Sequence, residues 1–251
     1  GGAAQGSGGL VSARPGVLVA LVALYRLLLR TQITVQRLLG IGALAALSIV
    51  IGLFARSDVD PSQAAADSVS GYGLGILVPL AALWLGTSAI GDLVEDKLLV
   101  YLSLKPVPRW QLPAAAILAT ASIVIPLTAL PLTASALVAG AGDVAWVTFL
   151  AASLAGLAYA GLFVAAGIWF RRAVWWGLAF VLIWENVVPY SADGAARYTV
   201  VGWGASILGL APGIDVEREA GSGGAAVVVL LAITVAGWLA ATWRYRRADI
   251  D

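Results

Sequence analysis

The residues that could carry chemistry in this chain are few. Histidine and cysteine are both absent from its 251 residues, so the sequence supplies no imidazole or thiolate metal ligand, no disulfide and no histidine proton relay. A phosphate-binding loop needs Gly-x4-Gly-Lys-Ser/Thr, whereas Lys97 and Lys105 precede Leu98 and Pro106. We therefore expect no catalytic residue, no metal site and no nucleotide site in this chain.

One ionisable side chain, Glu185, interrupts a long apolar stretch. It lies thirteen residues beyond Arg172, which is about 20 Å along an α-helix. An isolated carboxylate at that depth in a membrane is costly, so we expect Glu185 to face protein or a water-filled cavity. Glu185 and Asn186 either line a translocation path or outer gate, or form a polar clasp hydrogen-bonded to the following loop. We favour the clasp, because no second buried charge pairs with Glu185.

A charged connector, Asp92–Arg109, is the second region of interest. Leu98–Leu102 and Leu104 form an apolar patch that a solvated loop does not normally expose. Either a protein partner docks on this patch, or a short helix floats among the headgroups with its leucines in lipid. We favour docking, and Pro106 and Pro108 argue against a simple continuation of the next helix.

The composition identifies the elements that must position these residues. The chain is 61% hydrophobic and 12% charged, whereas soluble domains average roughly 45–50% apolar and about 25% charged residues. Crossing about 30 Å of hydrocarbon takes about 20 apolar residues. Six windows meet this requirement, and they lie at Leu38–Ala55, Gly71–Ile90, Leu112–Val138, Val144–Phe170, Ala173–Tyr190 and Gly224–Trp243.

We therefore expect an all-α membrane protein with one six-helix transmembrane domain over residues 37–247. Twelve of the fifteen Lys and Arg residues fall on one side if both termini are cytoplasmic, which predicts that orientation. The loop at 92–111 is then cytoplasmic, and the loop at 191–223 is external, with an apolar half that re-enters the outer leaflet as short helices. The basic residues border the membrane rather than forming one patch, so nucleic acid is not an expected partner.

The chain before the first span divides into two parts. Residues 1–16 are expected to be flexible, and residues 17–36 to form an amphipathic helix lying on the membrane surface, because their apolar run is too short to span. Arg30 and Arg37 lie about 40° and about 20° from Arg26 around a continuous helix, so the three would share a face toward anionic headgroups. The alternative is an extension of the first span. Residues 248–251 form a cytoplasmic tail.

Two features concern helix packing. Pro79 inside the second span frees a backbone carbonyl and permits a kink. Ala152, Gly156 and Ala160 place small residues at intervals of four, a stripe that lets another helix approach closely.

The run Glu95-Asp-Lys-Leu-Leu-Val-Tyr-Leu-Ser-Leu-Lys-Pro-Val-Pro-Arg109 resembles the cytoplasmic loop between the second and third spans of ABC-2 type transporter permeases. In that family an acidic pair is followed by Gly-Thr, an apolar stretch and Pro-Val-x-Arg, and here Lys97-Leu98 stands in place of Gly-Thr. The basic helix before the first span, and the Trp184-Glu185 pair before a long outer loop, are also similar to the layout of bacterial members.

The resemblance implies a permease subunit in a bacterial plasma membrane, with export as the commoner direction. Its partners would be membrane lipids, a second permease that is identical or related, and cytoplasmic ATP-binding cassette subunits that hold ATP and Mg²⁺. The ATPase-coupling residues would be Asp92, Glu95, Asp96, Tyr101, Leu102, Pro106 and Arg109.

Two other classes remain open. A structural or assembly subunit of another complex needs only the packing stripe and a partner for the connector. An intramembrane enzyme needs paired acids, a nucleophile with a base, or a metal, and the single deep carboxylate makes this class less favoured.

Overall fold

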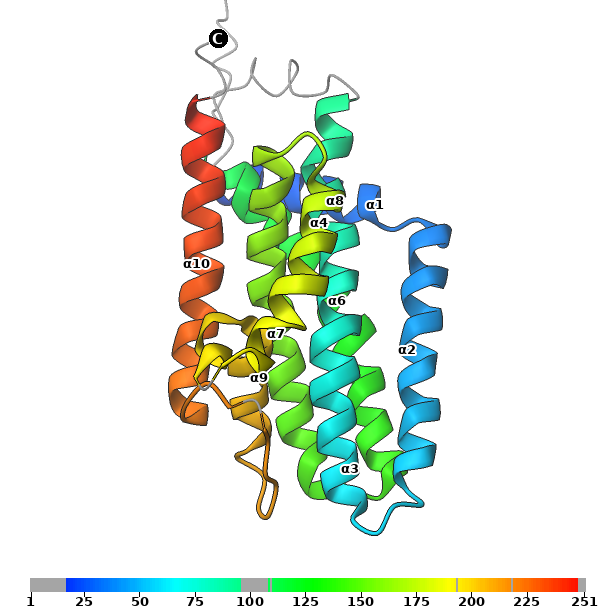
Figure 1. The fold of residues 1–251 in the computed structure, drawn as a ribbon. Coiled ribbons are helices and arrows are strands. Elements are labelled where there is room, and N and C mark those ends of the chain that lie inside the picture. The colour runs from blue at the N-terminus through cyan, green and yellow to red at the C-terminus, as the bar shows by residue number, and fades with distance from the viewer. Residues whose placement is uncertain (1–16, 96–107, 109, 193, 218, 248–251) are drawn as a thin grey trace, which may run out of the picture.

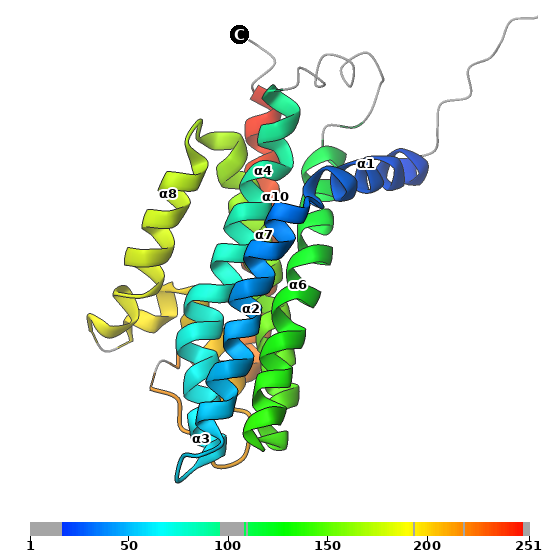
Figure 2. The same ribbon diagram turned by 90° about the vertical axis from the view of Figure 1, so that its right-hand side faces the viewer.

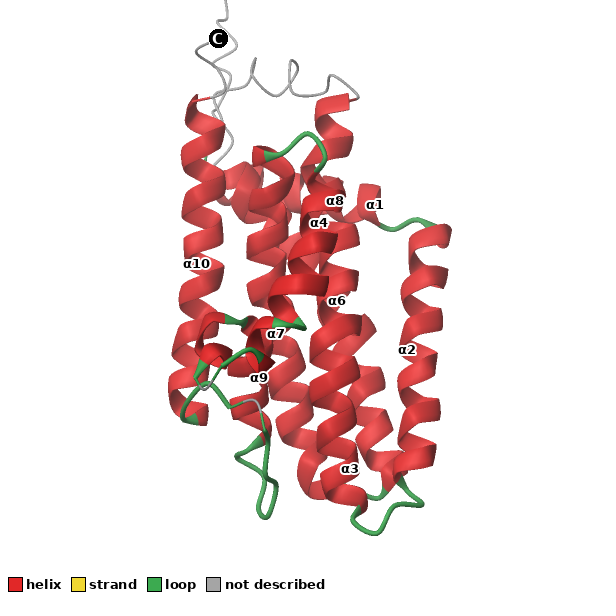
Figure 3. Cartoon of the chain, in the orientation of Figure 1, coloured by secondary structure: helices red, strands yellow, loops and turns green. Residues whose placement is uncertain are grey.

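The computed structural model describes residues 17–95, 108, 110–192, 194–217 and 219–247. Within these ranges the chain forms helices, loops and turns, without a strand (Figure 3). The helical elements are α1 (Val17–Gln32), α2 (Val35–Ala55), α3 (Pro61–Ser68), the π-helical η1 (Val69–Leu77), α4 (Val78–Glu95), α6 (Gln111–Ala139), α7 (Gly142–Trp169), α8 (Ala173–Ala179), the π-helical η2 (Phe180–Glu185), the 3-10 turns η3 (Val188–Tyr190) and η4 (Ala195–Tyr198), α9 (Val200–Leu208) and α10 (Gly223–Arg247).

Six helical stretches in the described part of the chain are long and apolar enough to cross a membrane. Each predicted window lies inside one of these stretches or extends one residue beyond it. The prediction of an all-helical, multi-pass membrane architecture is therefore confirmed. The stretches are Val35–Ala55, Pro61–Ala89, Gln111–Ala139, Gly142–Trp169, Ala173–Tyr190 and Gly223–Arg247.

The six stretches divide into a central group and a peripheral group (Figure 1). In the stretch containing α4 and in α6 and α7, 61–72% of the residues in an 18-residue apolar window are buried. In α2, the α8–η2 stretch and α10, only 22–28% of such residues are buried. The exposed side chains of the peripheral group are largely apolar, as in Ile183 (62% exposed) and Val228 (67% exposed). In a membrane these faces contact lipid, which removes their apolar surface from water.

Arginine side chains mark one end of the bundle. The end of α4, the start of α6, the turn between α7 and α8 and the last turn of α10 all lie at the top of Figure 1. That end carries Arg171, Arg172, Arg244, Arg246 and Arg247, and we call it the basic end. The turns that join α2 to α3 and α6 to α7 lie at the opposite end.

The N-terminal helix is shorter than the predicted 17–36 helix. α1 ends at Gln32, and Thr34 is extended (φ −116°, ψ 142°) before α2 begins. Three consecutive β-branched residues, Ile33-Thr34-Val35, explain this break, since restricted χ1 rotamers lower their helix propensity. Arg37 therefore belongs to α2, and the prediction that it shares one continuous face with Arg26 and Arg30 is wrong. α1 runs across the bundle rather than along it (Figure 2).

The second stretch begins earlier than predicted, at Pro61 rather than Gly71. Asp60 Oδ1 accepts hydrogen bonds from the backbone N–H groups of Ser62 and Gln63, both at 3.1 Å. Pro61 follows at the first helical position, where its missing N–H costs nothing. This Asp-Pro helix start adds two turns, α3, at the end of the stretch opposite the basic end.

Candidate functional site

Glu185 ends η2 and is fully buried (0% exposed). Its Oε1 accepts a hydrogen bond from the Val200 N–H at 3.2 Å, and its Oε2 accepts one from the Val201 N–H at 3.0 Å. These donors belong to the first turn of α9, whose N–H groups have no partner within the helix and lie at the positive end of its dipole. The carboxylate is thus stabilised by backbone dipoles rather than by an opposite charge.

Thr199 completes this helix start. It precedes α9 in an extended conformation, and its Oγ1 accepts a hydrogen bond from the Gly202 N–H at 3.1 Å. The first three N–H groups of α9 are therefore all bonded to side chains, two to Glu185 and one to Thr199. The N-terminus of α9 is consequently attached to Glu185 at the end of η2.

Asn186 makes the second connection from the same point in the chain. Its Nδ2 donates hydrogen bonds to the carbonyls of Gly75 (2.9 Å) and Val181 (2.8 Å). Gly75 lies four residues before Pro79, so in an α-helical register its carbonyl would bond the N–H that Pro79 lacks. Asn186 therefore supplies a donor to a carbonyl beside the proline, from a residue 111 positions away in sequence.

The backbone is irregular on both sides of this contact. Gly75 lies in η1 and Val181 in η2, and π-helical turns of this kind are often found at functional sites. A Cβ at Gly75 would lie 2.9 Å from Asn186 Oδ1, so the Asn186 side chain would have to shift if residue 75 were larger than glycine. We name the group formed by Gly75, Glu185, Asn186, Val200 and Val201 the outer clasp, after the side of the membrane that the sequence predicts for it.

Tyr159 of α7 lies against the outer clasp. It is fully buried, and its ring stacks on Phe163 with centroids 5.7 Å apart. Its hydroxyl interacts electrostatically with the Glu185 carboxyl group but does not reach hydrogen-bond geometry. A small shift of α7 toward η2 would form that hydrogen bond, so the position of α7 is relevant to the clasp.

The hydrogen bonds of the outer clasp join neighbouring segments of the chain. Both oxygens of Glu185 are engaged by backbone donors, and no group of three acidic residues in the described ranges is placed to hold a metal ion. The hydrogen bonds of Glu185 join the end of η2 to the start of α9. Glu185 and Asn186, adjacent in sequence, bring together three segments, η1, η2 and α9.

The other predicted site residues lie away from the clasp. Asp92 and Glu95 lie in the final turns of α4, at the basic end. Arg26 and Arg30 are exposed on α1, and Arg37 is partly buried near the start of α2. The remaining residues of the predicted coupling site lie outside the described residues, and they are Asp96, Tyr101, Leu102, Pro106 and Arg109.

Sequence reasoning missed Gly75, Tyr159 and Thr199 as members of this region. Pro79 was a usable signal, because a freed carbonyl inside a membrane span needs a donor, but the sequence does not identify which donor reaches it. No family model matches the sequence, and no curated protein matches it. The interpretation of the clasp therefore depends on its own geometry.

Proposed function

We propose that this chain is the permease subunit of an ATP-binding cassette exporter in a bacterial plasma membrane. It forms the translocation path with a second permease, identical or related, and separate cytoplasmic subunits bind and hydrolyse ATP with Mg²⁺. The chain itself catalyses no reaction. Substrate passes between the two permeases, and the outer clasp belongs to the outer gate.

The connector leaves and rejoins the helix bundle at the same end, the basic end, and this observation supports the proposal most directly. α4 ends at Glu95 and α6 begins at Gln111, both at the basic end, where α1 and the last turn of α10 also lie (Figure 1). Positively charged ends of membrane helices favour the cytoplasmic side. The ends of α4 and α6 therefore support a cytoplasmic connector, and the resemblance to ABC-2 type permeases implies that its apolar stretch binds the ATPase.

The span that carries the connector also reaches the outer clasp. Glu95 lies at one end of the continuous helical stretch α3–η1–α4, and Gly75 lies 20 residues earlier, about 30 Å along a helix axis. Because Asn186 bonds the Gly75 carbonyl, a displacement of α4 by the ATPase would reach the end of the fifth span through η1. In the proposed mechanism, closure of the ATPase subunits moves α4 and thereby opens or closes the outer gate.

α1 offers a second point of contact for the ATPase, in the role of an interfacial helix. Leu24 and Leu28 pack into the bundle beside α6, and the Tyr25 hydroxyl donates a hydrogen bond to Ser122 Oγ at 3.1 Å. Arg26 and Arg30 lie on its exposed side, where they are available to anionic headgroups. Movement of α1 would therefore move the first turns of α6.

A paired charge reversal tests the proposal. We expect Glu95→Lys combined with Arg109→Glu to abolish co-purification of the ATP-binding subunit and ATP-dependent export, because both changes fall on the proposed docking element. The matched control is Arg56→Glu with Asp58→Lys, which makes the same exchange in the loop between α2 and α3 at the opposite end. Intact association and export in the first variant would overturn the docking assignment, and a complex without any ATP-binding protein would favour an assembly subunit.

A further inference from the structure

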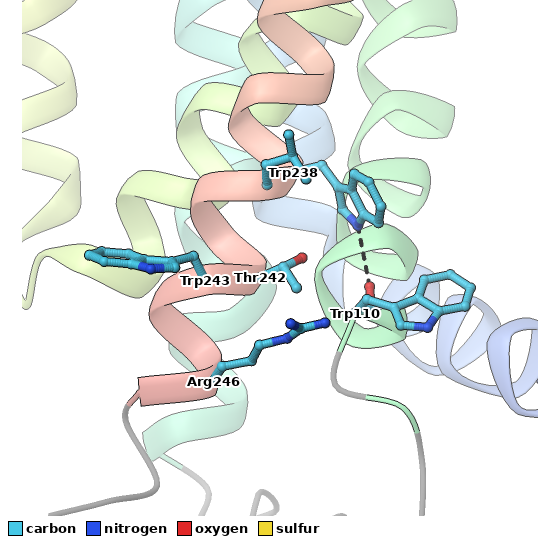
Figure 4. A pocket seen from close by; sticks show the side chains of 6 residues that line it. Trp110, Trp238, Thr242, Trp243 and Arg246 are labelled. Atoms are coloured by element: carbon cyan, nitrogen blue, oxygen red, sulfur yellow. Dashed lines mark hydrogen bonds between the residues drawn. The ribbon is translucent and has the colours of Figure 1, made fainter.

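A groove of about 520 Å³ opens at the basic end, between α10 and the start of α6 (Figure 4). Its wall on α10 consists of Trp238, Leu239, Thr242, Trp243 and Arg246, and Trp110 forms the facing wall. At 100° per residue these five α10 side chains span an arc of about 140°, with Arg246 near its middle. They cover about 12 Å of the helix axis.

The tryptophans are held in place by contacts with one another and with neighbouring side chains. Trp238 Nε1 donates a hydrogen bond to the Trp110 carbonyl at 3.3 Å, and the two rings meet edge to face with centroids 6.4 Å apart. Trp243 stacks on Trp169 at 5.6 Å, and the Arg247 guanidinium lies 3.9 Å from the Trp243 ring centroid. The walls are thus preformed, and Arg247 already has a partner on the Trp243 ring.

Thr242 is the polar group that this groove leaves without a partner. It is only 7% exposed, and its hydroxyl has no hydrogen-bond partner among the described residues. Thr234, two turns earlier on the same helix, instead bonds back to the Leu230 carbonyl at 3.0 Å. In Figure 4 the Thr242 hydroxyl faces the space between α10 and Trp110, and Arg246 extends across that space toward Trp110.

We propose that this groove binds the headgroup of an anionic phospholipid from the leaflet at the basic end. Tryptophan side chains prefer the headgroup region of a bilayer. One face of α10 packs on α7, but α10 also carries exposed apolar side chains such as Val235 and Leu239, so a lipid reaches the groove laterally. Arg246 supplies charge-assisted hydrogen bonds to the phosphate, and Thr242 supplies a neutral one. Leu239 and the tryptophan rings contact the glycerol and the first methylenes of the acyl chains.

Native mass spectrometry of the purified chain tests this site, with dioleoylphosphatidylglycerol and dioleoylphosphatidylcholine as probes. We expect phosphatidylglycerol to bind at least about tenfold more tightly than phosphatidylcholine, and Arg246→Ala to weaken its binding about tenfold, the size of one charge-assisted hydrogen bond. Thr242→Val keeps the shape of the side chain and should weaken binding about threefold to tenfold. Arg247→Ala removes the same charge one residue away and should change binding less than about twofold.

Three results would overturn the assignment. Equal affinity for the two lipids would show that the groove does not distinguish an anionic headgroup from a zwitterionic one. An equal loss in Arg246→Ala and Arg247→Ala would show only a general attraction between the basic end and anionic lipid. Displacement of bound phosphatidylglycerol by sn-glycerol 3-phosphate at comparable concentration would identify a soluble phosphate compound as the ligand. A melting temperature within about 2 °C of wild type in Thr242→Val would show that any loss of binding is not a folding defect.

Discussion

Glu185 is a buried carboxylate whose cost is offset by two backbone N–H groups of a neighbouring helix. Such hydrogen bonds to a charged acceptor contribute about 1.5–3 kcal/mol each, so the two together lower the cost of burying this side chain. The same bonds make the start of α9 dependent on one side chain. The role of Glu185 is therefore best examined by a substitution that keeps its size.

We expect Glu185→Gln to destabilise the protein by about 1–3 kcal/mol, because the amide retains one acceptor oxygen and turns an NH₂ group toward a backbone donor. Hydrogen exchange at the Val200 and Val201 amides should accelerate, and thermal unfolding should begin at a lower temperature. Glu217→Gln, at an exposed outer position, is the matched control and should leave both unchanged. Unaltered exchange at residues 200 and 201 in Glu185→Gln, together with lost transport, would instead indicate a role in the translocation path.

A second residue-scale prediction concerns Asn186 and Pro79. Asn186→Leu removes the donor to the Gly75 carbonyl and should cost about 1–3 kcal/mol. Pro79→Ala restores a backbone N–H four residues after Gly75, so Asn186→Leu should cost less when combined with it. A double-mutant cycle on the free energy of unfolding measures this coupling. The same cycle with Pro126→Ala, in α6, is the control, and equal coupling in both cycles would refute the pairing.

At the scale of elements, small residues determine how closely the helices pack. Ala152, Gly156 and Ala160 of α7 are all buried, and a Cβ at Gly156 would lie 3.3 Å from Val124 of α6, so the predicted packing stripe is confirmed. A closer contact involves glycines that the sequence analysis did not identify. A Cβ at Gly237 of α10 would lie 2.5 Å from the carbonyl carbon of Gly161 in α7.

We expect Gly237→Ala to separate α7 from α10 and to cost about 1–3 kcal/mol, because the added methyl meets backbone atoms that cannot rotate away. Gly224→Ala on the same helix is the matched control, since a Cβ there meets nothing within 4 Å, and it should be neutral or stabilising. Thermal unfolding of the two purified variants measures the difference. Equal melting temperatures would show that α7 and α10 are not packed at this glycine pair.

At the scale of the whole molecule, the distribution of charge predicts orientation. The basic end gathers arginines from the turn between α7 and α8 and from α10, in a chain whose net charge is only +1. The asymmetry therefore lies in the placement of the charges and not in their sum. Positive residues near membrane borders favour the cytoplasmic side, which predicts that both α1 and the connector are cytoplasmic.

The absence of cysteine allows a direct test of this orientation. We expect Ser57→Cys, in the loop between α2 and α3, to react with a membrane-impermeant maleimide in intact cells. Ser103→Cys, in the connector, should react only after the cells are opened. The two variants are each other's controls, and the reverse pattern of labelling would invert the topology and rule out docking of a cytoplasmic ATPase on the connector.

The sequence alone determined the helical class and the approximate positions of six stretches that are long and apolar enough to cross a membrane. These follow from the length of each apolar run, a local property that needs no knowledge of neighbours in space. The packing stripe on α7 was also readable, because helical periodicity places residues at intervals of four on one face. The break at Ile33-Thr34 was missed because an apolar window does not register the low helix propensity of three consecutive β-branched residues.

Only the tertiary structure decided what the polar residues do. Glu185 and the start of α9 are 15 and 16 positions apart, Asn186 and Gly75 are 111 apart, and Trp238 and Trp110 are 128 apart. Hydrogen bonds act over about 3 Å, so partners this far apart in sequence meet only after the spans have packed. Composition and spacing marked Glu185 and Pro79 as groups in need of partners, and the packing of the helices selected the partners.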